Sequence, residues 1–209
     1  MRRMIVVLAV LALALPIAAW ADMFTMTNQY GSVAILDSGI TSMGSHLHSY
    51  QVNNNPMVVA KKGAGLGYVN FATGALTSGS ILGGGTFSST GSYFDVFGVG
   101  SKKQGVPQGA IFTGAFVGTV DWTLVSQVKG TYNFQLTGDL VGTLWDGRNA
   151  HGSTTQNIVL FKGQWLKDNK GAIKVGATGF TTAPEPGTLA LLGTGLVGIA
   201  TAVRRKFVS

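Results

Sequence analysis

Two histidines form the closest pair of potential metal ligands in this sequence. His46 and His48 lie in the segment SHLHS (residues 45–49), and a two-residue spacing places both imidazoles on one face of a β-strand. Such a pair can begin a zinc or copper site, but the site needs at least a third ligand. Spacing brings neither His151 nor Asp37 to the pair. We therefore predict no metal and no other cofactor, and His46 with His48 is the pair to examine in the structure.

The carboxylates between residues 22 and 183 are all aspartates, and no spacing among them points to a catalytic pair. Glycoside hydrolysis requires two carboxylates that face the same bond. Asp95, Asp121 and Asp139 fall on the polar faces or edges of predicted strands, where contact with water explains them. The sequence also lacks the Gly-x-Ser-x-Gly motif of many serine hydrolases, and it contains no cysteine for thiol catalysis. The prediction is a non-enzymatic protein, with an extracellular hydrolase as an alternative.

Two tryptophans are the best candidates for ligand binding. Trp145 precedes the predicted loop DGRNAHGS (residues 146–153), and Trp165 ends the segment NIVLFKGQW (residues 157–165). Indole rings at strand ends offer flat apolar faces on which sugar rings can stack, and Asp146, Arg148 and Asn149 offer hydrogen bonds to hydroxyl groups. This gives carbohydrate binding as a second functional hypothesis. The alternative is that both rings pack at the rim of the fold, whereas Trp122 is predicted to lie in the core.

The elements that position these residues are predicted to be β-strands, because apolar and polar residues alternate through much of residues 22–182. In TYNFQLTGDL (residues 131–140), Tyr132, Phe134 and Leu136 share one face, and polar residues share the other. Further strands are predicted at residues 66–71, 75–82, 92–99, 111–125, 157–161 and 172–180, with loops that include residues 53–56, 102–109 and 126–130. The pattern favours a mainly β protein, built as an antiparallel β-sandwich or barrel.

A partial repeat raises an alternative architecture. Gly-x-x-Val-Gly-Thr occurs at residues 114–119 and again at residues 138–143, as it would in a β-solenoid. The sequence between the two copies does not repeat, so we interpret them as paired strands of a hairpin. Gly138 is predicted to mark a bulge or bend within its strand.

The net charge of +7 lies largely at the two ends of this 209-residue chain. Arg2 and Arg3 precede an apolar segment, and Ala19-Trp20-Ala21 supplies a small-x-small site. This order is typical of a secretory signal peptide that signal peptidase removes after Ala21. Because the central part carries no basic cluster larger than Lys-Lys, we predict no nucleic-acid partner.

The C-terminal segment combines three features in order. Pro184-Glu185-Pro186 is followed by the uncharged residues 188–203 and then by Arg204-Arg205-Lys206. At about 1.5 Å rise per residue, a helix over 188–203 would be about 24 Å long, which is short for a bilayer core of about 30 Å. The basic residues 204–206 would remain on the cytoplasmic side of the inner membrane. We predict a single, weakly anchoring membrane helix.

These three features resemble the PEP-CTERM sorting signal, a tail that is sometimes labelled as the ice-binding protein C-terminal segment. The resemblance implies that an exosortase, a membrane-embedded processing enzyme, is a partner. It also implies a bacterium that makes extracellular polysaccharide, which is a further candidate partner. The resemblance covers residues 183–206 and does not extend to the preceding domain. Ice binding would require a flat Thr-x-Thr ladder, and Thr25 with Thr27 is a single pair, so we do not transfer that label.

The sequence thus predicts a signal peptide (residues 1–21), an exported β-rich domain (residues 22–182) and a sorting signal (residues 183–209). The predicted function is that of an exported, non-enzymatic protein of the cell surface or extracellular matrix. It would cross the inner membrane through the export machinery, be held there briefly, and then be released to the surface. The alternatives are secreted carbohydrate binding through Trp145 and Trp165 and, third, extracellular hydrolysis.

Overall fold

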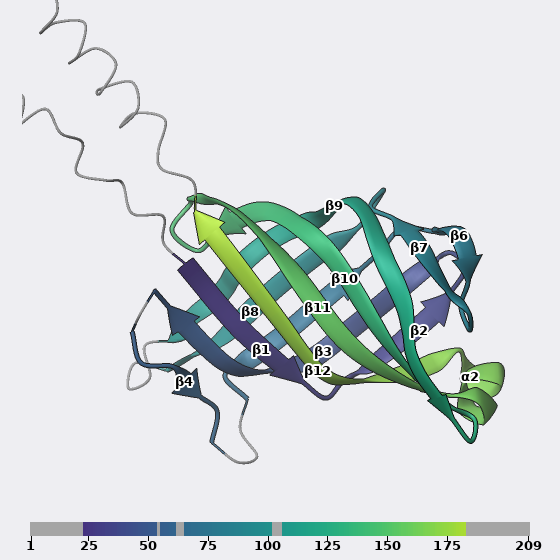
Figure 1. Ribbon diagram of the computed structural model, residues 1–209. Helices are drawn as coiled ribbons and strands as arrows, with labels where there is room; N and C mark the ends of the chain where they lie inside the picture. The colour runs from purple at the N-terminus through teal and green to yellow at the C-terminus, as the bar shows by residue number, and fades with distance from the viewer. Residues whose placement is uncertain (1–22, 54, 62–64, 102–105, 183–209) are drawn as a thin grey trace, which may run out of the picture. The chain divides into compact units, whose positions relative to one another are not determined.

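The computed structural model describes residues 23–53, 55–61, 65–101 and 106–182. The described part contains twelve strands and one short helix, α2 (Lys162–Asp168), which follows β11 directly (Figure 1). The strands are β1 (Met23–Gln29), β2 (Ser32–Leu36), β3 (Gly39–Val52), β4 (Val58–Val59), β5 (Gly67–Ala72), β6 (Leu76–Ser80), β7 (Gly84–Ser88), β8 (Tyr93–Ser101), β9 (Val106–Val128), β10 (Thr131–Leu144), β11 (Asn149–Phe161) and β12 (Lys170–Thr182). Residues 22–182 form one compact unit. The predicted signal peptide and sorting signal lie outside the described residues.

Eight of the strands close into an antiparallel β-barrel. Their order around the barrel is β9, β10, β11, β12, β1, β3, β5 and β8, and β8 then pairs with β9. The chain is therefore a barrel rather than a sandwich, and the β-solenoid alternative is wrong because the pairings form one closed antiparallel sheet. β9 has 23 residues, which is long enough to pair with β8 along its first half and with β7 along its second half.

The alternation of residue types determines which side chains fill the barrel. In β10, Tyr132, Phe134 and Leu136 are buried and the residues between them are more exposed, as their shared parity predicts. Trp122 of β9 is 1% exposed, and its ring stacks on Phe134 with 4.2 Å between the ring centroids. The prediction that Trp122 belongs to the core is confirmed. Side chains fill the interior of this barrel, so it forms a packed scaffold.

Several predicted loops are shorter in the structure because the strands continue into them. The predicted loop at residues 146–153 is reduced to a tight turn, since β11 begins at Asn149, which pairs with Thr143. The connection between β9 and β10 needs only Lys129 and Gly130, whose positive φ angles of 47° and 80° suit a two-residue hairpin turn. The alternation of apolar and polar residues in the sequence does not show at which residue these strands end.

The hairpin interpretation of the partial repeat is confirmed. Its two copies lie on the neighbouring strands β9 and β10, where Val117 is opposite Asp139. The register between these strands shifts on passing Gly138, so the strands bend there without β10 ending.

A polar cluster crosses the barrel interior between β1, β3, β11 and β12. Asn28 and Gln156 are both 0% exposed. Asn28 Nδ2 donates to Gln156 Oε1 at 2.9 Å, and Gln156 Nε2 donates to Asn28 Oδ1 at 3.2 Å. The same two amide groups donate to Ser45 Oγ and Thr154 Oγ1, each at 2.8 Å. A side chain at Gly176 would collide with both amide oxygens. Because buried amides are stable only with partners, the cluster favours this one register of the strands.

The two ends of the barrel differ in what they carry. At one end, which we call the terminal end, the described chain enters and leaves side by side, since Met23 is opposite Thr181. At the other end, which we call the helix end, β2 joins β12 to β3, and the β6–β7 hairpin pairs with β9. The helix α2 also lies at this end (Figure 1).

Candidate functional site

The predicted sugar-contact residues separate into two groups. Trp145, Asp146 and Arg148 belong to the β10–β11 turn, and Asn149 begins β11 at the terminal end, where the neighbouring Ala150 pairs with Thr182. Trp165 lies on α2 at the helix end. The 13 residues of β11 stand between them, which corresponds to about 40 Å of extended strand. The two indole rings therefore lie at opposite ends of the barrel, so one sugar ring cannot contact both.

The β10–β11 turn is held together by its own charged pair. Arg148 Nε donates to Asp146 Oδ2 at 2.8 Å, and Arg148 Nη2 lies 2.6 Å from the same oxygen. The Arg148 backbone N–H donates to Asp146 Oδ1 at 3.1 Å. These contacts lower the pKa of the Asp146 carboxyl, with the side-chain hydrogen bond as the largest cause. Trp145 is 41% exposed and packs against Phe24 with 5.7 Å between ring centroids. Asp146 and Arg148 thus stabilise the turn on which an exposed indole sits.

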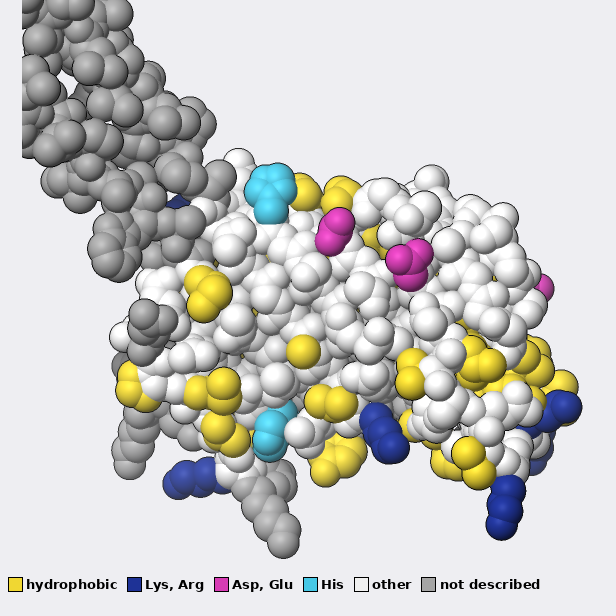
Figure 2. All heavy atoms as spheres, viewed as in Figure 1, with side chains coloured by type: hydrophobic (Ala, Val, Ile, Leu, Met, Phe, Trp, Pro, Cys, Tyr) yellow, Lys and Arg dark blue, Asp and Glu magenta, His cyan; other side chains and the backbone are white. Residues whose placement is uncertain are grey.

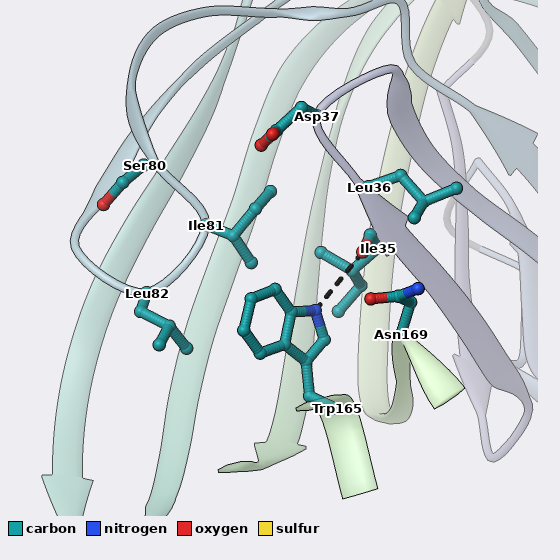
Figure 3. A pocket seen from close by; sticks show the side chains of 8 residues that line it. All are labelled: Ile35, Leu36, Asp37, Ser80, Ile81, Leu82, Trp165 and Asn169. Carbon is teal, nitrogen blue, oxygen red and sulfur yellow. Dashed lines mark hydrogen bonds between the residues drawn. The ribbon is translucent and has the colours of Figure 1, made fainter. Parts of the chain in front are cut away.

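The helix end contains a pocket around Trp165 with a volume of about 520 Å³. Three segments form it: the end of β2 with the residue that follows it, the β6–β7 turn, and α2 with its C-terminal cap (Figure 3). Its lining residues are Ile35, Leu36, Asp37, Ser80, Ile81, Leu82, Trp165 and Asn169. The Trp165 Nε1–H group donates to the Ile35 backbone carbonyl at 3.3 Å. This bond fixes the indole ring, so its face is part of a preformed wall.

The polar groups of this pocket come from different segments. Asp37 follows β2, and Ser80 ends β6, where its Oγ accepts a hydrogen bond from the Gly83 backbone N–H at 3.0 Å. Asn169 caps the C-terminus of α2 with a left-handed φ of 53°, and its backbone N–H donates to the Trp165 carbonyl at 2.8 Å. A carboxylate, a hydroxyl and an amide therefore line the same pocket as this indole ring. The pocket fits a small polar ligand that offers one flat, partly apolar face.

The histidines lie on the outer face of the barrel. His46 and His48 belong to β3, where His46 is exposed and its ring meets Tyr30 edge-on at 6.4 Å between centroids. His151 is exposed on β11, near the terminal end. Within residues 23–182, as far as the structure describes them, no three His, Cys, Asp or Glu side chains gather into a metal-binding group.

Two titratable groups have environments that the sequence did not point to. Burial raises the pKa of Asp95, although the Gly114 backbone N–H acts in the opposite direction, and Asp95 Oδ1 is buried without a partner among the described residues. Burial, together with the Asp146 charge, raises the pKa of Tyr50 to about 12. Tyr50 is 5% exposed and packs edge-on against Phe24. Parity places Asp95 on a polar strand face, but parity does not show how deeply the carboxylate is buried.

Comparison with protein families identifies the tail rather than the barrel. The chain is an eight-stranded antiparallel barrel with a C-terminal segment, residues 182–206, that matches the PEP-CTERM protein-sorting motif. The resemblance seen in Pro184-Glu185-Pro186 and in the basic residues 204–206 is thereby confirmed. Searches of the curated proteins and of the solved structures found no match. In the described part of the chain, no helix is both long and apolar enough to cross a bilayer.

Proposed function

We propose that this chain is an exported, non-enzymatic protein that an exosortase processes and delivers to the cell surface or extracellular matrix. The observation that carries the proposal is the PEP-CTERM match at residues 182–206. The motif begins where β12 ends, at Thr182, so a cut near Pro184-Glu185-Pro186 would leave every strand of the barrel intact. In this scheme residues 188–203 hold the protein in the inner membrane until processing, with residues 204–206 on the cytoplasmic side.

The barrel is suited to survive such processing. Met23 and Thr181 are paired in the sheet, so both connections to the terminal segments leave from one end. The amide cluster and the aromatic core lie within residues 24–180. Removal of both terminal segments would therefore leave these contacts in place.

The sorting step is tested by replacing Pro184-Glu185-Pro186 with three alanines in the full chain. We expect a larger species that stays in the membrane fraction, because the processing enzyme no longer recognises the tail. The matched control replaces Phe207, Val208 and Ser209 with alanines, since these residues follow the matched segment. If the first variant is released at the same size as the parent, the proposal is wrong.

The pocket around Trp165 supports carbohydrate binding as a second candidate function. A pocket lined by a half-buried indole, a carboxylate, a hydroxyl and an amide suits a sugar ring, which has both apolar faces and hydroxyl groups. Affinity chromatography of residues 22–182 on immobilised polysaccharides tests this. We expect Asn169→Gly, which keeps the left-handed cap, and Trp165→Ala to weaken retention, and Trp145→Ala to leave it unchanged. If only Trp145→Ala weakens retention, the sugar site is at the terminal end.

A further inference from the structure

Exposed apolar side chains gather at the helix end of the barrel. Val128, Phe161 and Leu166 are 62%, 49% and 66% exposed. They come from the end of β9, the end of β11 and α2, and Thr131 lies opposite both Val128 and Phe161. Figure 2 shows hydrophobic side chains collected at the end that carries α2 in Figure 1. A contiguous patch of exposed apolar side chains indicates an interaction site, whereas apolar side chains that are exposed singly need no such explanation.

Lysines surround this cluster. Lys129 lies in the β9–β10 turn, and Lys162 begins α2, where its backbone N–H donates to the Gly130 carbonyl at 2.9 Å. Lys167 lies in the last turn of α2, and the helix end also carries Lys170 and Lys174 of β12. Lys61, beyond β4, is the remaining described lysine. Among the described residues, Lys129, Lys162 and Lys167 form no ion pair, so their charges face solvent.

The charge of this end is positive even after its acidic residues are included. This end carries two aspartates, Asp168 of α2 and Asp37 of the pocket. It also carries five lysines, at positions 129, 162, 167, 170 and 174, so the positive charges outnumber the negative ones. The other aspartates of the described part lie on the barrel wall or at the terminal end: Asp95, Asp121, Asp139 and Asp146. The partner that complements this end is therefore anionic.

We propose that the helix end docks on the surface of an anionic lipid membrane. Lysine side chains would contact the headgroups, and Val128, Phe161 and Leu166 would enter the boundary between headgroups and acyl chains. A lipid surface is favoured over a soluble anionic polymer because these apolar side chains would find nothing to bury them on such a polymer. The apolar residues also lie at strand ends and in the short helix α2, in the outermost part of this end (Figure 1), where a flat bilayer can reach them.

This contact is independent of the sorting tail. The described chain enters and leaves the barrel at the terminal end, and the lysine cluster is at the helix end. Docking would therefore give the released domain a reversible membrane contact of its own. It concerns residues 125–175 and does not depend on whether an exosortase acts at residues 182–206.

The test uses residues 22–182, because either terminal segment would bind lipid by itself and because this unit has its own core and closed sheet. Co-sedimentation is measured with vesicles of phosphatidylcholine alone and of phosphatidylcholine mixed with phosphatidylglycerol. We expect binding to the phosphatidylglycerol vesicles that weakens as salt is raised. The triple change of Lys129, Lys162 and Lys167 to Gln should lower the affinity about a hundredfold, since each lysine near an anionic surface contributes about fivefold.

Matched variants separate this surface from the rest of the barrel. Leu166→Ser should lower binding at least severalfold, whereas Val99→Ser on β8, 58% exposed near the terminal end, should not. Lys61→Gln is the charge control. Thermal midpoints equal to that of the parent show that each variant is folded.

The proposal is overturned if the domain does not bind phosphatidylglycerol vesicles, or if it binds neutral vesicles equally well. It is also overturned if binding is unchanged by both the lysine and Leu166 variants. Retention on a soluble sulfated polysaccharide, without vesicle binding, would instead assign the lysines to an anionic polymer.

Discussion

The buried amide pair gives a sharp test of what holds the barrel strands in register. Gln156→Met keeps the length of the side chain but removes its amide, which leaves Asn28 Oδ1 and one Asn28 Nδ2–H without partners among the described residues. Asn28→Leu removes the Asn28 Nδ2–H donor and so leaves Gln156 Oε1 without a hydrogen-bond partner among the described residues. Each buried polar group left without a hydrogen-bond partner lowers the free energy of unfolding by about 1–3 kcal/mol, and the added apolar burial partly offsets this loss. We expect each single variant to lower the free energy of unfolding by about 3 kcal/mol.

The double variant distinguishes a coupled pair from two independent contacts. When both amides are replaced, no orphaned amide remains, and Thr154 still has the Thr178 hydroxyl at 2.9 Å as a partner. The double variant should therefore lower the free energy of unfolding by about as much as one single variant does. The coupling energy between the two positions would then be about 2–3 kcal/mol.

Urea unfolding of residues 22–182 measures these energies, with tryptophan fluorescence and far-ultraviolet circular dichroism as separate probes. Coincident transitions are required before the free energies are compared. If the two single losses add to within about 0.5 kcal/mol in the double variant, the two amides do not act as a pair and the reasoning is refuted.

Two further predictions concern single positions. Gly176→Ala should destabilise the barrel by several kcal/mol, about as much as the loss of the amide pair, because the added methyl group would displace both amide oxygens. The control in the same urea assay is Gly163→Ala, where the new methyl group meets no atom within 4 Å. Asp95→Asn should raise stability at pH 7 by up to about 1 kcal/mol after allowance for solvent screening. The folded pKa of Asp95 is raised from 3.8, so the parent protein holds this proton more tightly when folded and loses stability as the pH rises through the raised value. The advantage of the variant should therefore vanish below about pH 3.8, and an advantage that is constant with pH would contradict the assignment.

Local patterns predicted the strands well and their ends poorly. The parity of Tyr132, Phe134 and Leu136 identified the inner face of β10, because one side of a strand packs on the core wherever it lies. The polar residues and glycines of residues 146–153 predicted a loop there, whereas β11 begins at Asn149. Polar residues are expected in loops and equally on the outer face of a barrel strand, so residue type alone does not separate the two.

The candidate sites depended on distances that local patterns do not contain. Trp145 and Trp165 are 20 positions apart in the sequence, and because most of that interval is the single extended strand β11, the two rings lie at opposite ends of the barrel. Asn28 and Gln156 are 128 positions apart, and they bond because β12 brings β1 and β11 onto its two sides. No spacing rule pairs such residues before the strand order is known.

The sequence by itself determined that the chain is mainly β and that it carries a sorting signal, because period-2 alternation and the order of Pro-Glu-Pro, apolar run and basic stop are both local in the chain. Only the tertiary structure decided that the sheet closes as a barrel, since closure depends on the pairing of β8 with β9 and of β9 with β10. The length of β11 set the two tryptophans at opposite ends, and the pairing of β10 with β11 brought Lys129 to the same end as Lys162 and Lys167. Strand length and strand pairing, rather than residue type, made both arrangements.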